Sequence, residues 1–342
     1  MTEPEADFTE FDQAGQIDQL RQTTVRLQRQ LLAAKAKTEH LLAAAFDGAK
    51  DAMVSFGPVP PVPEPKADTR KRTAEVALWD MGDWQGAKLT PTYNSEVMQR
   101  RVLQFCDKAQ RITEIQRADH PIRDAVLIFG GDQVEGLFNF GTQVFEIDAT
   151  LFGQYVTVSR LLMDVVRRAL AVYEHVEVVA EWGNHGRIGS KRDSVPRSDN
   201  VDRMCYEFAR SMLGDEKRLT WPDCPEDIQR LQVGNYRAIV IHGDEVGRGG
   251  YASPATIVQH VAKWQSGAYP WAFRDCYVHH YHNHQEFGLP NGLGAVYYTG
   301  STESENRYAL TTMAASATPS QRLQFIDPGE GRVTSSHKIW LD

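Results

Sequence analysis

Residues 125–135 read AVLIFGGDQVE. The first five are apolar, and two glycines then lead to Asp132. A short unbroken apolar run is typical of a strand buried on both faces, as in a parallel sheet covered by helices. In open α/β sheets, ligands bind beyond the carboxyl ends of such strands. The stretch therefore predicts an α/β fold with Asp132 at the functional edge of a sheet.

The same order, an apolar run and then polar residues, occurs at four other places along the chain. The motifs there are DMGDWQ (80–85), GNHGR (183–187), IHG (241–243) and HHYH (279–282). They offer carboxylate oxygen, amide oxygen and imidazole nitrogen, which suit Mn, Fe, Zn or Mg, and they offer no thiolate. The five motifs together predict a site for divalent metal ions.

A pair of such ions points to one kind of reaction. Two divalent ions about 3.5–4 Å apart can clamp a phosphoryl group, lower the pKa of a water and stabilise both the attacking and the leaving oxygen. We therefore expect phosphoester hydrolysis that depends on two divalent cations. Manganese is the first choice, with Fe, Zn, Mg or Ni as alternatives.

The segments between the motifs alternate between helical and strand-like patterns. Helices are expected at 95–118, 148–175 and 201–213, and short strands at 295–299, 321–326 and 337–341. Strands that alternate with helices are typical of α/β architecture.

The order and spacing of the five motifs resemble the calcineurin-like metallophosphoesterase family, whose pattern is D-x-H, G-D, G-N-H-D/E, a lone H and G-H-x-H. The resemblance covers residues 74 to about 305. It implies an αββα sandwich of two mixed sheets. GNHGR, together with YNSE at 93–96, is also similar to phage-encoded members of the family.

The resemblance implies a role for each motif residue. Asp132 would bridge the two ions. The second ion would be held by Asn184, His242 and His280, and the first by the opening aspartate and His282. His185 would be the family's non-ligand histidine, which protonates the leaving oxygen or stabilises the transition state. Arg187, two residues further on, is grouped with His185 as a candidate catalytic residue.

The opening motif departs from the family pattern because it has no histidine. If Asp83 is the family aspartate, Gln85 takes the histidine position and offers an amide oxygen. If Asp80 is, that position falls on Gly82, which has no side chain to offer. We expect Asp83 with Gln85, keep Asp80 as the alternative, and expect the first ion to bind weakly. His279 also stands where the family has glycine, a change that removes no ligand.

Basic residues gather directly after His185. They are Arg187, Lys191, Arg192, Arg197 and Arg203. Such cations can bind the phosphate groups that flank a scissile one. The alternative is a solvated loop that Asp193 and Asp199 partly neutralise. We weigh the two equally, and name Lys191 and Arg192 as the candidate phosphate-binding residues.

The amino-terminal part differs in kind from the rest. Residues 17–53 are rich in Leu, Ala, Gln and Lys and carry an apolar helical stripe. Residues 1–56 are therefore expected to form a helical arm, which either dimerises as a coiled coil or packs on the catalytic domain. The five prolines of 57–65 mark a linker, taken as 57–70, before a metallophosphoesterase domain at 71–342.

Composition limits the setting in which this chain works. Its 342 residues, 42% of them hydrophobic, are enough for one sizeable core. There is no run of 18 uncharged apolar residues and no signal-peptide pattern, and the four scattered cysteines fit reduced thiols. We expect a cytoplasmic protein, in the host cytoplasm if phage-encoded, with no membrane partner. The net charge of -8 argues against a broad non-specific nucleic-acid surface.

These features favour a metal-dependent phosphodiesterase that acts on DNA as a nuclease. One alternative is a cyclic-nucleotide phosphodiesterase or a phosphoprotein phosphatase. Another is a catalytically weak scaffold that binds DNA or protein, because the first motif has lost its histidine. A scaffold would tolerate loss of His185, so its presence counts against that alternative.

Overall fold

In the computed structural model the chain divides into two compact units, Met1–Gly57 and Pro58–Asp342. The structure describes residues 59–138, 143–189, 196–223, 226–246, 252–290, 292–304 and 318–342, with Thr23, Val25, Arg26, Ala44, Gly48, Asp51, Ser55 and Gly57. All of these single residues except Gly57 are helical. The helical arm expected at 1–56 otherwise lies outside the described residues, as do Lys191 and Arg192, so these expectations stay predictions.

The first sheet has six strands in the order β11-β10-β1-β2-β3-β4. Their bounds are β1 (Glu75–Met81), β2 (Ile122–Gly130), β3 (His175–Glu181), β4 (Leu219–Thr220), β10 (Ser320–Asp327) and β11 (Arg332–Trp340). Strands β1 to β4 pair in parallel. Strand β10 is antiparallel to β1, and β11 to β10. The sheet is therefore mixed, with its parallel part carrying the first three motifs.

The second sheet has five strands in the order β5-β6-β7-β9-β8. Their bounds are β5 (Gln229–Val233), β6 (Tyr236–Ile241), β7 (Asp275–Val278), β8 (Gln285–Gly288) and β9 (Ala295–Tyr298). Strands β6, β7 and β9 pair in parallel, while the two outer strands are antiparallel to their neighbours. This sheet is mixed as well.

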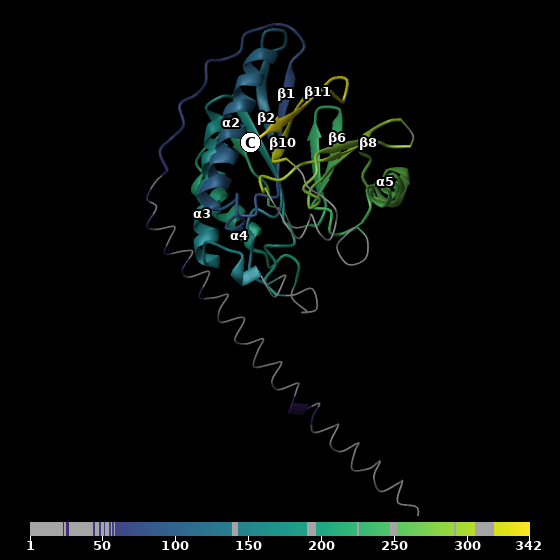
Figure 1. The fold of residues 1–342 in the computed structure, drawn as a ribbon. Coiled ribbons are helices and arrows are strands. Elements are labelled where there is room, and N and C mark those ends of the chain that lie inside the picture. Colours follow the sequence, from purple (N-terminus) through teal and green to yellow (C-terminus); the bar gives the residue numbers. More distant parts are fainter. Residues whose placement is uncertain are drawn as a thin grey trace, which may run out of the picture. The chain divides into compact units, whose positions relative to one another are not determined.

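Helices cover the outer faces of both sheets. Their bounds are α2 (Ser95–Gln116), α3 (Leu151–Leu170), α4 (Val201–Met212) and α5 (Pro254–Lys263), with short turns η1 (Gln143–Phe145) and η2 (Trp264–Ala268). Figure 1 shows α2, α3 and α4 on the side of the first sheet and α5 on the side of the second. This confirms the expected αββα sandwich of two mixed sheets. No described helix has the length and apolar character that crossing a membrane requires.

The core explains why the strands read as unbroken apolar runs. On one face of the first sheet, Leu78 and Ile128 pack with Val240 and Tyr277 of the second sheet. On the other face, the ring of Trp79 packs edge-on against Phe105 of α2 and against Tyr173. Every residue of β1 is buried, because successive side chains face opposite, covered sides.

Strand β11 is longer than the sequence predicts, since it begins at Arg332 and not at residue 337. Its first residues alternate between exposed and half-buried, and most are polar. They pair with β10, and the pairing of backbone groups holds them in the sheet. An edge strand with little apolar surface gives only a weak signal in the sequence.

The topology brings the motifs to one edge of the sandwich. Strands β1, β2 and β3 run in parallel in the first sheet, and β6 and β7 do so in the second. Each of these five strands ends within a few residues of a polar motif. A hydrogen bond from the His280 N–H to Asp83 Oδ2, at 2.9 Å, joins the two sheets at this edge.

Candidate metal centre

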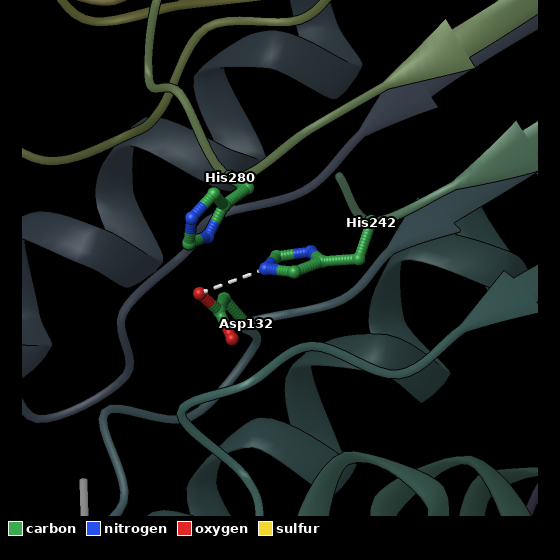
Figure 2. Close-up of side chains that lie close together, drawn as sticks. All are labelled: Asp132, His242 and His280. Atoms are coloured by element: carbon green, nitrogen blue, oxygen red, sulfur yellow. Dashed lines mark ion pairs between the residues drawn. The ribbon is translucent and has the colours of Figure 1, made fainter. Parts of the chain in front are cut away.

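Three of the expected ligands lie close together. Asp132, His242 and His280 each present a donor atom within 4.8 Å of the others. Figure 2 shows both imidazole rings converging on the Asp132 carboxylate. His242 Nε2 lies 3.1 Å from Asp132 Oδ2 and 3.2 Å from Asn184 Oδ1. Ligands about 2.0–2.2 Å from a metal lie roughly 3 Å from each other around it, so this group fits one cation.

The ring of His242 is held in the orientation that a metal ligand needs. Its Nδ1 lies 2.8 Å from the carbonyl oxygen of Gly130, which accepts a hydrogen bond from it. The Nε2 lone pair is then directed at Asp132 and Asn184. Burial lowers the pKa of His242, but the charge of Asp132 outweighs this and raises the pKa well above its usual value. The same negative field favours a metal cation.

The ligands expected for the first ion form another group beside Asp132. His282 Nε2 lies 3.5 Å from Asp83 Oδ1 and 3.2 Å from Gln85 Nε2, and that amide nitrogen is 3.4 Å from Asp132 Oδ2. Gln85 Oε1 is buried without a hydrogen-bond partner. Half a turn of the amide exchanges its oxygen and nitrogen, and directs the oxygen at Asp132 and His282. This donor set fits the first ion, and the three residues of the other group fit the second.

Asp80 lies outside both groups. Its carboxylate contacts His279 Nε2 at 2.8 Å, accepts a hydrogen bond from Thr299 and lies 3.9 Å from Arg322 Nε. Asp80 is fully buried, and its carboxylate is held by these contacts in the interior. Of the two aspartates that the sequence left open, Asp83 is the one that lies beside His282.

His279 is wedged between two glycines. A Cβ atom at Gly130 would lie 2.1 Å from the His279 ring, and one at Gly82 would lie 2.5 Å from it. Neither position can carry a side chain while histidine occupies position 279. His279 is accommodated by these two glycines and by its contact with Asp80.

The backbone of the site is unusual in the described part of the chain. Non-glycine residues with positive φ there are Asp83 (51°), Gln85 (49°), Ala87 (81°), Asp132 (51°), His280 (71°) and His282 (53°). Five of the six are expected metal ligands. A left-handed residue with a side chain is disfavoured and persists only where the surrounding structure imposes it, most often at functional sites. At this site the left-handed backbone conformation turns the ligand side chains back over the strand ends.

Asp202 holds two of the loops together, although no sequence motif marks it. From the first turn of α4 its carboxylate accepts hydrogen bonds from the backbone N–H groups of Asp132, Gln133, Val134 and Gly183, at 2.8 to 3.1 Å. The residue is fully buried. An acidic residue in the first turn of a helix is common for electrostatic reasons alone, so the sequence signal is not specific.

His185 lies beside the centre and is paired with Glu135. Its Nδ1 is 3.1 Å from the Glu135 carbonyl oxygen and 3.2 Å from Glu135 Oε2, while its Nε2 is 3.9 Å from Asp132 Oδ2. Burial lowers the pKa of His185, but Asp132 and Glu135 more than offset this and raise it to about 9. The raised pKa favours the protonated imidazole, which is the form that can donate a proton. Glu135 belongs to a quoted motif, but the sequence did not assign it this contact.

Two of the arginines that follow His185, Arg187 and Arg197, contact carboxylates of the segment after β6. Arg187 Nη2 lies 2.5 Å from Asp244 Oδ2. Arg197 Nη2 lies 2.7 Å from Asp244 Oδ1 and 2.6 Å from Glu245 Oε1. Burial raises the pKa of Asp244, but Arg197, His242 and Arg187 together lower it below its usual value. The alternative in which acidic residues neutralise these cations therefore applies to Arg187 and Arg197. Their acidic partners are Asp244 and Glu245.

No family model matches this chain. It is similar to the SPbeta prophage-derived uncharacterized protein YonJ of Bacillus subtilis (strain 168), at 20% identity over 318 residues, which are 87% of this chain and 71% of that protein. Among solved structures it is similar to Vps29 complexed with Zn²⁺ from Entamoeba histolytica (12% identity, 78% of this chain and 99% of that one, TM-score 0.34). It is also similar to a phosphatase from Mycoplasma pneumoniae (9% identity, 79% of this chain and 94% of that one, TM-score 0.31). A further similar structure is the phosphopantetheinyl hydrolase PptH from Mycobacterium tuberculosis (14% identity, 68% of this chain and 92% of that one, TM-score 0.30).

Replacement of Asp202 tests how the loops are held. Asp202→Ala leaves four buried N–H groups without their acceptor, so the free energy of unfolding should fall by about 3 kcal/mol or more. Asp202→Asn keeps one acceptor oxygen and should cost less. Urea unfolding without added metal measures both. Equal stability of the alanine variant and the wild type would contradict the anchoring role.

Proposed function

We propose that this protein is a phosphodiesterase that depends on two divalent metal ions, and that it acts on DNA as a nuclease. The observation that carries the metal-dependent activity is the position of the Asp132 carboxylate between two ligand groups. Asp132 Oδ2 faces His242 on one side, at 3.1 Å, and Gln85 on the other, at 3.4 Å. One carboxylate that faces two ligand groups is the arrangement that a pair of adjacent cations requires.

The residues divide the chemistry between them. Two divalent ions bound here would neutralise charge on a phosphoryl group and lower the pKa of a water. The backbone N–H of His185 donates to Asp132 Oδ1 at 2.7 Å and so fixes the direction of the shared carboxylate. Mn²⁺ is the cation we expect first, because the donor set mixes imidazole nitrogen with carboxylate and amide oxygen.

His185 is proposed as the general acid. Its Nδ1 is engaged by Glu135, so the proton on Nε2 faces the centre. A proton held there can pass to the leaving oxygen as the phosphoester bond breaks. Arg187 is proposed as a further catalytic residue only if it exchanges its contact with Asp244 for one with the phosphate.

Two observations support DNA as the proposed substrate. The first is the group of basic residues after His185, of which Lys191 and Arg192 stay the candidates for phosphate binding. The second is the similarity to a prophage-derived protein. Cyclic nucleotides and phosphoproteins are the alternative substrates that an assay must compare.

The ligand and acid roles predict different losses. Asp132→Asn removes the shared charge and should abolish hydrolysis of bis-p-nitrophenyl phosphate and reduce the amount of bound Mn²⁺. His185→Ala should bind Mn²⁺ as the wild type does and lose about 100-fold or more in kcat. Metal content by mass spectrometry after dialysis and steady-state kinetics measure the two effects. Undiminished metal in Asp132→Asn would contradict the ligand assignment.

The substrate is tested by cleavage of single-stranded and double-stranded DNA with Mn²⁺, beside cyclic nucleotides and a phosphopeptide. We expect DNA cleavage by the wild type and none by His280→Ala, which loses a ligand of the second ion. The inactive variant excludes a contaminating nuclease. Hydrolysis of cyclic nucleotides without DNA cleavage would refute the nuclease proposal while leaving the phosphodiesterase intact.

The pairing of His185 with Glu135 predicts a pH effect. A proton donor works below its pKa, and its activity is lost as the pH rises through that value. The charge of Glu135 raises the pKa of His185, so Glu135→Gln should move the alkaline fall of kcat to lower pH. The pH profile of kcat measures the shift, and His185→Ala should show no such fall. An unmoved profile in Glu135→Gln would rule out the pairing as the cause.

A further inference from the structure

Glu303 reaches the metal centre from a strand end that belongs to none of the five motifs. It follows β9, which pairs in parallel with β7, so the residues after both strands come to the same edge of the second sheet. The side chain is buried, and Glu303 Oε2 lies 3.1 Å from Nδ1 of His282. The carboxylate of Glu303 therefore contacts the ring nitrogen of His282 that is not directed at the proposed metal position.

Hydrogen bonds fix the Glu303 segment to the first motif. The Ser301 hydroxyl donates to the carbonyl oxygen of Asp83 at 2.6 Å and accepts from the Glu303 N–H at 2.9 Å. Arg101 of α2 donates to the Thr302 carbonyl oxygen at 2.7 Å. Glu303 is thus held at a set position relative to Asp83, by contacts that do not involve its own carboxylate.

The two nitrogens of His282 face different partners. Nε2 is directed at Asp83 and Gln85, and Nδ1 at Glu303. A carboxylate accepts a hydrogen bond from a protonated Nδ1, and this leaves the Nε2 lone pair free to bind a metal. His242 is oriented in the same way, but by the neutral carbonyl of Gly130. A charged acceptor makes the imidazole a stronger donor than a neutral one does.

The two ligand groups differ in donor strength. The second group has two imidazoles, from His242 and His280. The first has one, from His282, with the weaker amide of Gln85 beside it. The carboxylate contact on His282 therefore lies on the group that has fewer strong donors.

We propose that Glu303 is the positioning residue of the first metal site, which directs Nε2 of His282 at the ion and strengthens it as a ligand to offset the weak donor Gln85. This inference rests on the proposed two-metal function. Glu303 does not touch the substrate or the metal; it acts through His282.

A different role for Glu303 would be to neutralise Lys88. Burial lowers the pKa of Lys88, and the charges of Glu135, Glu303 and Glu146 more than offset this. Lys88 Nζ lies 3.2 Å from Glu135 Oε1 and 3.0 Å from Glu146 Oε2, so it already has two carboxylate partners. A role of this kind would alter stability and leave metal affinity unchanged.

Titration of the full chain with Mn²⁺, followed by the electron paramagnetic resonance signal of the free ion, separates the two roles. In Glu303→Gln the affinity of the first site should fall about 10- to 100-fold, while the second site keeps its wild-type affinity. Glu135→Gln is the matched control, because Glu135 is also a buried glutamate beside a histidine Nδ1, but that histidine is not a proposed ligand. It removes the same charge from the same edge, so any loss of Mn²⁺ affinity there should affect the two sites alike, and only Glu303→Gln should weaken the first site selectively.

Gln85→His supplies the missing imidazole and gives the second test. It should strengthen the first site and should restore Mn²⁺ binding in the Glu303→Gln background, which also shows that this background is folded. Two sites of unchanged affinity in Glu303→Gln, or equal weakening of both sites, would overturn this inference alone. A wild type that binds fewer than two Mn²⁺ would instead refute the two-metal function on which it rests.

Discussion

The shared carboxylate of Asp132 has to face two groups of ligands at once, and much of the surrounding structure serves to keep it there. The His185 N–H holds one of its oxygens, and Asp202 binds the backbone on both sides of it. Gly183 leaves room for it, since a Cβ there would lie 2.0 Å from Asp132 Oδ1. The rigidity of the centre therefore comes from backbone contacts, which are set by the ends of β2 and β3.

This arrangement concentrates negative charge in the interior. Asp83, Asp132, Glu135, Asp202 and Glu303 are all buried near the same edge. Buried carboxylates repel one another unless cations or protons offset them. The raised pKa of His242 is one sign that the centre attracts positive charge. Binding of divalent ions would relieve the same repulsion, which couples occupancy of the site to the stability of the strand ends.

The sequence predicts most of the architecture because the buried strands are unbroken apolar runs and the ligands follow them directly. It favoured Asp83 over Asp80 but did not exclude Asp80, since both end the same run and only the turn of the backbone after β1 separates them. It missed Asp202 because the contact with Asp132 spans 70 residues. Arg187 looked available for phosphate because Asp244, its partner, lies 57 residues further along. Such long-range pairs have no local pattern.

The wedge of His279 between Gly82 and Gly130 links three positions that are far apart in the sequence. They lie on different strand ends and share one small volume, so the residue at each position limits the size of the residues at the other two. While His279 is paired with Asp80, a side chain at either glycine is excluded. The three positions therefore act as one steric unit, and a side chain at position 82 or 130 would require a smaller residue at position 279.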